Sequence, residues 1–209
     1  VVDKLLSENT SAYKDAAIAG IKRILGLNNC DTIPTNKISC VKMGTTVATN
    51  ALLERKGDRT LLLITDGFGD LLKIGYQNRP LLFDLDIKLP ELLYEKVVEI
   101  PERLDSQGKV IKNLDIKKAR QALREAKSEG IDSVAIAFMH SYVNPEHENI
   151  IAKIAEEENF NQISVSHRVS PLIKLVGRGD TTVVDAYLSP ILRRYVNQIS
   201  EELKGTETT

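Results

Sequence analysis

Residues 43–56 read MGTTVATNALLERK, and this stretch joins a short apolar strand to the start of a helix. We expect a strand over Ile38–Met43 and a close backbone turn at Gly44. Either Thr45 or Thr46 would then cap the helix. The first amides of a helix have no partner within it and lie at the positive end of its dipole, where a phosphate or carboxylate is favoured. An ordinary capped helix would have the same sequence, so both interpretations stay open here.

A pattern of strand, helix and strand continues outward from this junction. The helix Thr46–Lys56 leads to an apolar strand at Thr60–Thr65. A second unit of the same kind has a strand at Ser133–Met139, a helix at Pro145–Glu158 and a strand at Gln162–Ser166. Such crossovers imply parallel strands with right-handed connections. The sequence therefore predicts an α/β fold with a parallel or mixed sheet and flanking helices.

The remaining segments predict three more helices and a hairpin. Apolar residues at helical spacing indicate helices over Ala12–Leu25, Asp115–Glu129 and Thr182–Leu203. Between the two strand-helix-strand units, we expect Glu95–Ile100 and Lys109–Ile111 to pair at the edge, around the Ser-Gln-Gly turn that separates them.

The composition is that of an ordinary globular chain. Of 209 residues, 42% are hydrophobic and 27% are charged. The formal net charge of -1 does not indicate binding to nucleic acid or to an anionic membrane. The longest apolar runs, such as Leu61–Ile64 and Val134–Met139, are too short to cross a bilayer, and no signal peptide is visible. We therefore expect a cytoplasmic protein whose partner is a small molecule. The absence of a Walker A loop, a dinucleotide fingerprint and a nucleophile elbow argues against three common enzyme classes.

The cysteines and histidines do not indicate a metal site. Cys30 and Cys40 fit neither a zinc-ligand pair nor a redox motif, so we expect two reduced thiols and no disulfide. His140, His147 and His167 lack the i, i+4 spacing of a helical metal site and have no cysteine near them. We expect no metal bound by this segment.

Three loops follow the predicted strands at their carboxyl ends. They are Gly44–Thr46, Asp66–Asp70 and His140–Asn144. Ligands of open parallel sheets bind beyond the carboxyl ends of the strands, so the three loops could share one cleft. Loops follow strands in any α/β domain, however, and this pattern alone does not decide between a shared cleft and ordinary separate loops.

The junction at residues 44–55 also carries a family resemblance. Gly-Thr-Thr-x-x-Thr-Asn-Ala-x-Leu-Glu-Arg resembles the signature near the start of the hydantoinase A and 5-oxoprolinase family, the ATP-dependent cyclic-amide hydrolases. The Arg-Gly that precedes Ala-Tyr-Leu is more similar to the 5-oxoprolinase branch of the family than to the hydantoinase branch. Further matches occur in the order that the family has them, at Gly67–Asp70, Ile74–Gly75, Gln77–Pro80, Phe83–Leu85, Tyr94–Glu95, Pro101–Arg103, His140–Glu148, Arg178–Gly179 and Asp185–Pro190.

The resemblance implies a part of an actin-like, ribonuclease H-like ATPase fold. Residues 1–180 would be the N-terminal domain of the family without its first phosphate-loop strand, because family members begin earlier, and residues 181–209 would be a helix leading into the remainder of the enzyme. The expected partners are this missing C-terminal region or a second subunit, in a homo- or hetero-oligomer. The isolated chain is expected to be inactive and to bind ATP weakly or not at all.

The chemistry that the resemblance implies is the ATP-driven opening of a lactam. Phosphorylation of the amide oxygen of 5-oxoproline, followed by water attack and ring opening, would give glutamate, ADP and phosphate. Such a site needs donors and Mg²⁺ around the phosphates. The alternatives are an ATP-dependent N-methylhydantoinase, a ketone carboxylase subunit or, in another class, a non-catalytic scaffold or subunit-binding module.

Two groups of residues are candidates for this site, and no catalytic base is assigned. Arg79 and Arg178 could hold a substrate carboxylate, since guanidinium pairs with it in bidentate geometry, or could equally form salt bridges. The loop Asp66–Asp70 is more acidic than the family pattern, so we expect no phosphate role for it. Contacts to phosphate or substrate oxygen are expected from Gly44, Thr45, Thr46, Thr49 and Asn50.

Overall fold

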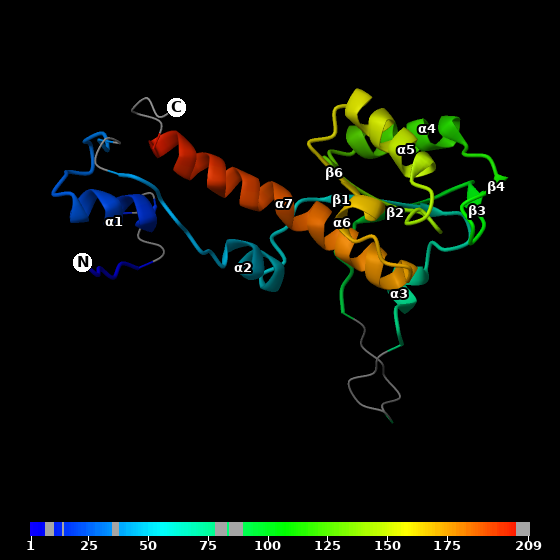
Figure 1. The fold of residues 1–209 in the computed structure, drawn as a ribbon, viewed down its shortest axis with the longest axis horizontal. Helices are drawn as coiled ribbons and strands as arrows, with labels where there is room; N and C mark the ends of the chain where they lie inside the picture. The colour runs from blue at the N-terminus through cyan, green and yellow to red at the C-terminus, as the bar shows by residue number, and fades with distance from the viewer. Residues whose placement is uncertain (7–10, 14, 35–37, 78–82, 84–89, 204–209) are drawn as a thin grey trace. The chain divides into compact units, whose positions relative to one another are not determined.

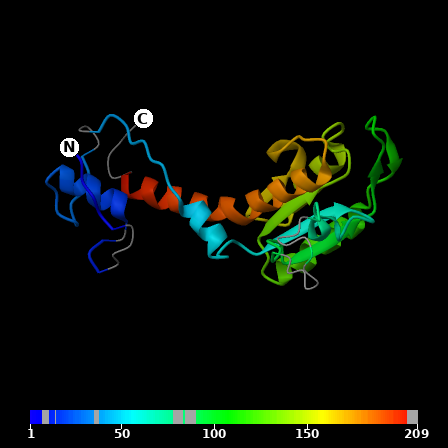
Figure 2. The same cartoon turned by 90° about the horizontal axis from the view of Figure 1, so that it is seen from below.

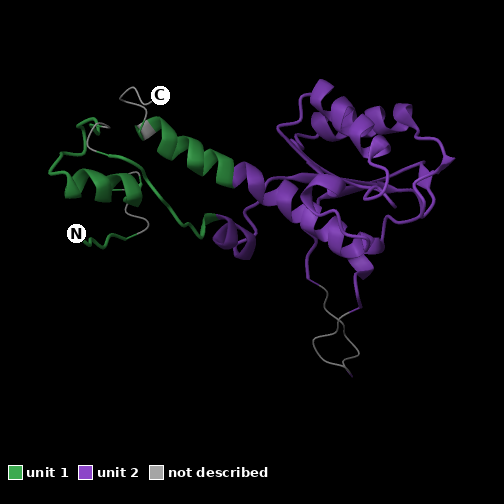
Figure 3. Ribbon diagram, in the orientation of Figure 1, with its two compact units in different colours: residues 1–47, 192–209 green, residues 48–191 purple. Residues whose placement is uncertain are grey.

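The computed structural model describes residues 1–6, 11–13, 15–34, 38–77, 83 and 90–203. The chain divides into two compact units, one of residues 1–47 and 192–209 and one of residues 48–191 (Figure 3). The larger unit carries the main sheet. The expected division between residues 180 and 181 stays a prediction.

A parallel sheet forms the centre of the larger unit. Its four strands lie in the order β2 (Lys96–Ile100), β1 (Thr60–Thr65), β5 (Ser133–Ala137) and β6 (Gln162–Val165). In the register, Leu62 of β1 lies opposite Val97 of β2 and Ala135 of β5. Because all four strands run the same way, their carboxyl ends meet at one edge. The predicted α/β fold with parallel strands is confirmed.

Helices cover both faces of this sheet. Helices α4 (Ile116–Ser128) and α5 (Glu146–Glu157) lie on one face, and α3 (Leu71–Ile74) and the first part of α7 (Leu175–Leu203) lie on the other (Figure 1). Alternate residues of β1 face the two cores. A strand buried on both faces reads as a continuous apolar run, which is why the sequence identified β1 without ambiguity.

The predicted edge hairpin is wrong in one of its two strands. β2 joins the sheet beside β1, and the antiparallel hairpin is formed by β3 (Arg103–Leu104) and β4 (Val110–Lys112). Burial explains the difference, because Ile100 at the end of β2 is fully enclosed in the sheet core, whereas a hairpin strand would expose it. The hairpin stands out from the sheet (Figure 2).

Local contacts shift several helix boundaries. The Asp115 carboxylate caps α4 by accepting from the Lys118 amide at 3.0 Å, close to the predicted start. Helix α7 begins at Leu175, before the predicted Thr182. Two glycines in its first turns allow this, since a Cβ at Gly179 would lie 2.9 Å from Leu72 of α3. Close packing therefore overrides the low helix propensity of glycine.

The smaller unit contains α1 (Ala16–Ile24), which begins after the predicted Ala12 because Asp15 caps it. Its core joins Ile18 and Ile33 to Ile199 of α7. The predicted strand at Ile38–Met43 is wrong. No described strand pairs with this segment, and an extended chain becomes a strand only when a neighbour takes up its backbone hydrogen bonds.

Two further features of the described residues are the state of the cysteines and the character of the helices. Cys30 and Cys40 are both free and exposed. None of the described helices combines the length and the apolar character that crossing a bilayer demands.

Candidate functional site

Two of the predicted loops meet at the carboxyl edge of the sheet. Asp66–Asp70 follows β1 and His140–Asn144 follows β5, and the strands are joined there by the Met139 amide, which donates to Thr65 Oγ1 at 2.8 Å. Helix α6 (Ser166–Val169) follows β6 at the same edge. Open parallel sheets bind ligands at this edge. The third loop, Gly44–Thr46, belongs to the smaller unit. That it lines the same cleft as the other two loops stays a prediction.

The predicted anion-binding junction has a shorter helix than expected. Helix α2 spans Val47–Leu53, and Thr45 Oγ1 accepts from the Val47 amide at 3.1 Å, so Thr45 caps it. Within the described residues the Thr46 side chain has no hydrogen-bond partner. The five predicted contact residues are all exposed, namely Gly44, Thr45, Thr46, Thr49 and Asn50.

These residues do not form a complete nucleotide site by themselves. A triphosphate needs amide and cationic donors that converge from several sides. The junction offers amides from one side only, and Thr45 already occupies that of Val47. In the part of the chain that the structure describes, no group of three or more His, Cys, Asp or Glu side chains is placed to hold a metal ion. These residues alone therefore do not make a site for ATP or Mg²⁺.

The loop after β1 is fixed by neighbouring side chains. Glu99 Oε1 accepts from the amides of Gly67 and Gly69, at 3.0 and 2.7 Å. Arg103 donates to the Asp66 carbonyl at 3.0 Å, and Lys112 Nζ lies 3.1 Å from the Asp66 carboxylate. The acidic character of this loop is thus partly neutralised by the hairpin strands.

A buried polar chain lies directly below the carboxyl edge. Glu102, only 1% exposed, accepts from the Thr65 hydroxyl on one oxygen and lies 2.7 Å from His147 Nδ1 through the other. Thr65 in turn accepts from the Met139 amide. This chain links the ends of β2, β1 and β5 to the first turn of α5.

A second buried carboxylate, Glu148, accepts hydrogen bonds on both oxygens. Oε1 accepts from the Phe138 amide at 2.8 Å and from the Ser166 hydroxyl at 2.6 Å. Oε2 accepts from the backbone amide and from Nδ1 of His167, at 3.1 and 2.6 Å. These bonds fill the accepting capacity of a carboxylate, so a charge could be held here without exposure to water.

Arg178 is fully buried behind this carboxylate. Burial lowers the pKa of Arg178, and the nearby Glu148 carboxylate opposes that shift. A guanidinium held this way orders the backbone around it rather than facing a substrate. Its nitrogens donate to Ser166 Oγ at 3.0 Å and to the carbonyls of Leu172, Ile173 and Phe138 at 2.5, 3.2 and 2.7 Å.

The other predicted arginine and Asp185 have separate positions. Arg79 lies outside the described residues. Asp185 joins α7 to β6, since it accepts from Ser164 Oγ of β6 at 2.7 Å. It also accepts from Ser189 Oγ within α7 at 2.7 Å. This arrangement gives Asp185 a structural role.

The charges of two aspartates act on a buried tyrosine on the α7 side of the sheet. Burial raises the pKa of Tyr94, and the charges of Asp70 and Asp180 raise it further. Burial also raises the pKa of Asp180. The Tyr94 phenol therefore stays protonated at neutral pH.

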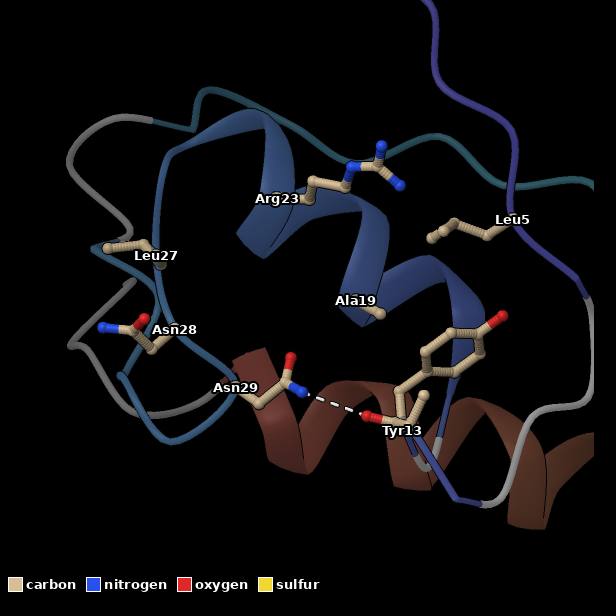
Figure 4. A pocket seen from close by; sticks show the side chains of 8 residues that line it. Leu5, Tyr13, Ala19, Arg23, Leu27, Asn28 and Asn29 are labelled. Atoms are coloured by element: carbon tan, nitrogen blue, oxygen red, sulfur yellow. Dashed lines mark hydrogen bonds between the residues drawn. The ribbon is translucent and has the colours of Figure 1, made fainter.

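The smaller unit has a cleft of about 460 Å³ whose lining is shown in Figure 4. Its polar groups are already paired within the chain. The Asn29 amide donates to the Ala12 carbonyl at 3.0 Å, the Asn28 amide donates to Asp31 at 3.2 Å, and Arg23 lies 3.4 Å from Asp3. This cleft thus presents few free groups to a ligand.

The spacing of the histidines in the sequence bears only on metal binding and does not indicate their carboxylate partners. His140, in the left-handed region with φ 59°, lies at the same edge as His147 and His167. The available signal was position, because His140 and His167 follow predicted strands directly. The pairing with Glu102 and Glu148 could not be read, since it depends on which strands are neighbours.

A parallel sheet between two helical layers, with buried polar groups under its carboxyl edge, is the architecture of ligand-binding and catalytic α/β domains. More particularly, the chain belongs to the hydantoinase/oxoprolinase family, because residues 1–159 match the N-terminal region of that family. The resemblance found in the sequence is thereby confirmed.

Two curated relatives are 5-oxoprolinases. The chain is 42% identical to 5-oxoprolinase 1 of Arabidopsis thaliana over 219 residues, which is 93% of this chain and 17% of that protein. It is 39% identical to 5-oxoprolinase of Saccharomyces cerevisiae over 241 residues, covering 100% of this chain and 19% of that protein. The chain therefore spans less than a fifth of the length of either relative.

Solved structures give the same fold. The ATP-dependent caprolactamase from Pseudomonas jessenii aligns with a TM-score of 0.75 at 30% identity, over 92% of this chain and 29% of that one. A nucleotide-free acetone carboxylase aligns with a TM-score of 0.66 at 23% identity, over 76% of this chain and 24% of that one, a likeness of fold alone. The chain has part of the actin-like ATPase fold of these relatives, as predicted.

Proposed function

We propose that this chain is the N-terminal part of an ATP-dependent cyclic-amide hydrolase that converts 5-oxoproline to glutamate. The observation that carries the proposal is the 42% identity to a 5-oxoprolinase across 93% of the chain. Because the chain spans 17% of that relative, the proposed activity belongs to a longer enzyme that carries this chain. ATP and Mg²⁺ are its cofactors, and the C-terminal region or a second subunit supplies the rest of the site.

A second candidate substrate is a larger lactam. The solved relative that covers 92% of this chain is named for caprolactam. Both substrates contain a cyclic amide, and 5-oxoproline differs by its smaller ring and its carboxylate. A cation that meets this carboxylate would favour 5-oxoproline, and Arg79 is our candidate for that cation.

The predicted site residues keep separate roles in this proposal. Gly44, Thr45 and Thr46 contact phosphate or substrate oxygen, with Thr49 and Asn50 in the next turn. Arg178 supports the site from beneath, because its donors hold the backbone at the ends of β5 and α6. It acts as a positioning residue and does not touch the substrate.

Phosphate release from ATP by the longer enzyme tests the proposal. The assay compares 5-oxoproline with caprolactam, N-methylhydantoin and acetone plus bicarbonate, each with Mg²⁺. We expect 5-oxoproline to stimulate ATP hydrolysis and to yield glutamate in equal amount. Stimulation by another compound only would overturn the substrate, and no stimulation by any lactam would overturn the function.

A further inference from the structure

Glu148 and His167 form a carboxylate–imidazole pair at the carboxyl edge of the sheet. Oε2 of Glu148 lies 2.6 Å from Nδ1 of His167, and the side chains are 0% and 14% exposed. A carboxylate accepts hydrogen bonds and donates none, so a neutral His167 carries its hydrogen on Nδ1. Nε2 is then left as a hydrogen-bond acceptor.

No group among the described residues bonds to Nε2 of this ring. The fully enclosed side-chain nitrogen and oxygen atoms without a partner in the described part of the chain are Ser133 Oγ and His140 Nδ1, so Nε2 is not fully enclosed. The ring thus offers one unprotonated nitrogen at the edge where a parallel sheet binds its ligand.

The pair is held rigidly from behind. Oε1 of Glu148 is fixed by the Phe138 amide and the Ser166 hydroxyl, and Arg178 Nε donates to that hydroxyl oxygen at 3.0 Å. The backbone amide of His167 donates to Glu148 as well. Partners of this kind fix the tautomer and the orientation of an imidazole.

We propose that His167 accepts the proton of the water that opens the lactam, and that Glu148 positions His167 for this step. The inference rests on the proposed function. The water oxygen bonds to the ring carbonyl carbon while its proton passes to Nε2. The ring C–N bond then breaks, and the imidazolium returns the proton to the ring nitrogen, so that lactam and water give the open amino acid.

The second pair, His147 with Glu102, provides a matched control. Its nitrogen and oxygen are 2.7 Å apart, but the imidazole is only 7% exposed. Glu102 also accepts from Thr65, which ties this pair to the ends of β1 and β5. We assign it a structural role.

Nitrogen-15 NMR of the histidines in the 209-residue chain tests the tautomer. We expect His167 to carry hydrogen on Nδ1 only. In Glu148→Ala the Nδ1 hydrogen loses its acceptor, so part of the ring hydrogen should move to Nε2. Glu102→Ala should leave His167 unchanged. A wild-type hydrogen on Nε2, or no change in Glu148→Ala, would overturn the inference.

Turnover by the longer enzyme tests the chemistry. His167→Asn keeps an amide donor near the Nδ1 position but removes Nε2, and kcat should fall about 10²- to 10⁴-fold with KM little changed. His147→Asn should reduce kcat less than about tenfold. Wild-type kcat in His167→Asn would sink the proposed role. If the unmutated enzyme opens no lactam, the proposed function fails, and the tautomer measurement still decides on the pair.

Discussion

Gly57 lies against the ring of Tyr187, and a Cβ at position 57 would be 2.0 Å from Cε1 of that ring. Tyr187 is 7% exposed, and its carbonyl accepts from the Asp58 amide at 3.0 Å. The Tyr187 ring therefore has little room to move away from position 57. The segment that enters β1 is held against α7 by this contact, which only glycine permits.

Gly57→Ala should lower the free energy of unfolding by about 1–3 kcal/mol, as overpacking of a core does. Urea unfolding followed by circular dichroism measures it. Gly44→Ala is the control, because a Cβ there meets nothing within 4 Å. Adding Tyr187→Leu to Gly57→Ala should cost less than the sum of the two single changes. An unfolding midpoint of Gly57→Ala at the same urea concentration as that of the wild type would contradict this close contact.

Arg178→Lys should cost about 2–4 kcal/mol, although the charge is kept. One ammonium cannot reach the carbonyls of Leu172 and Phe138 as well as Ser166 Oγ, so buried acceptors lose their donors. Hydrogen exchange should rise at residues 138–142 and 171–173. Arg168→Lys, at an exposed bond to Asn149, is the control. Unchanged exchange in Arg178→Lys would refute its positioning role.

The sequence predicted the parts of the fold that depend on local pattern. β1 was readable because both its faces are buried, and α4 because Asp115 caps it and its apolar residues recur at helical spacing. The neighbour of β2 was not readable, since the same segment could pair in a hairpin or in the parallel sheet. Only the burial of Ile100 decides between them.

The candidate site was less accessible to sequence reasoning. Glu102 and His147 are 45 residues apart and meet because β2, β1 and β5 are consecutive in the sheet. Glu148 and His167 are 19 residues apart and meet because β5 and β6 are adjacent. Arg178 was predicted as a candidate to hold a substrate carboxylate, and its burial behind Ser166 could not be read from one residue. Contacts between strands far apart in the sequence need the topology before they can be inferred.

Tyr94→Phe should change the response to alkaline pH. The pKa of Tyr94 is raised in the folded chain, first by burial and then by Asp70 and Asp180, above its ordinary value of about 10. The unfolded chain therefore loses this proton first. The stabilisation is complete below about pH 10 and falls as the pH rises towards the folded pKa, by at most about 1.4 kcal/mol per pH unit.

Urea unfolding between about pH 8 and pH 11 measures this effect. Tyr94→Phe should lose less stability than the wild type above about pH 10, and Tyr195, whose pKa is also raised, is present in both proteins and cancels. Parallel curves for the two proteins would show that the Tyr94 phenol is not shifted by its surroundings.

Thr45→Ala and Thr46→Ala should separate the cap of α2 from the proposed anion contact. Thr45 Oγ1 accepts from the Val47 amide, so its loss should destabilise the chain by about 1 kcal/mol. The Thr46 side chain has no hydrogen-bond partner among the described residues, and Thr46→Ala should leave the free energy of unfolding unchanged within about 0.5 kcal/mol. In the longer enzyme, however, Thr46→Ala should reduce turnover of 5-oxoproline at least about tenfold, since one tenfold step corresponds to a single lost donor of about 1.4 kcal/mol. Full turnover by a stable Thr46→Ala enzyme would mean that this strand-to-helix junction is an ordinary capped helix.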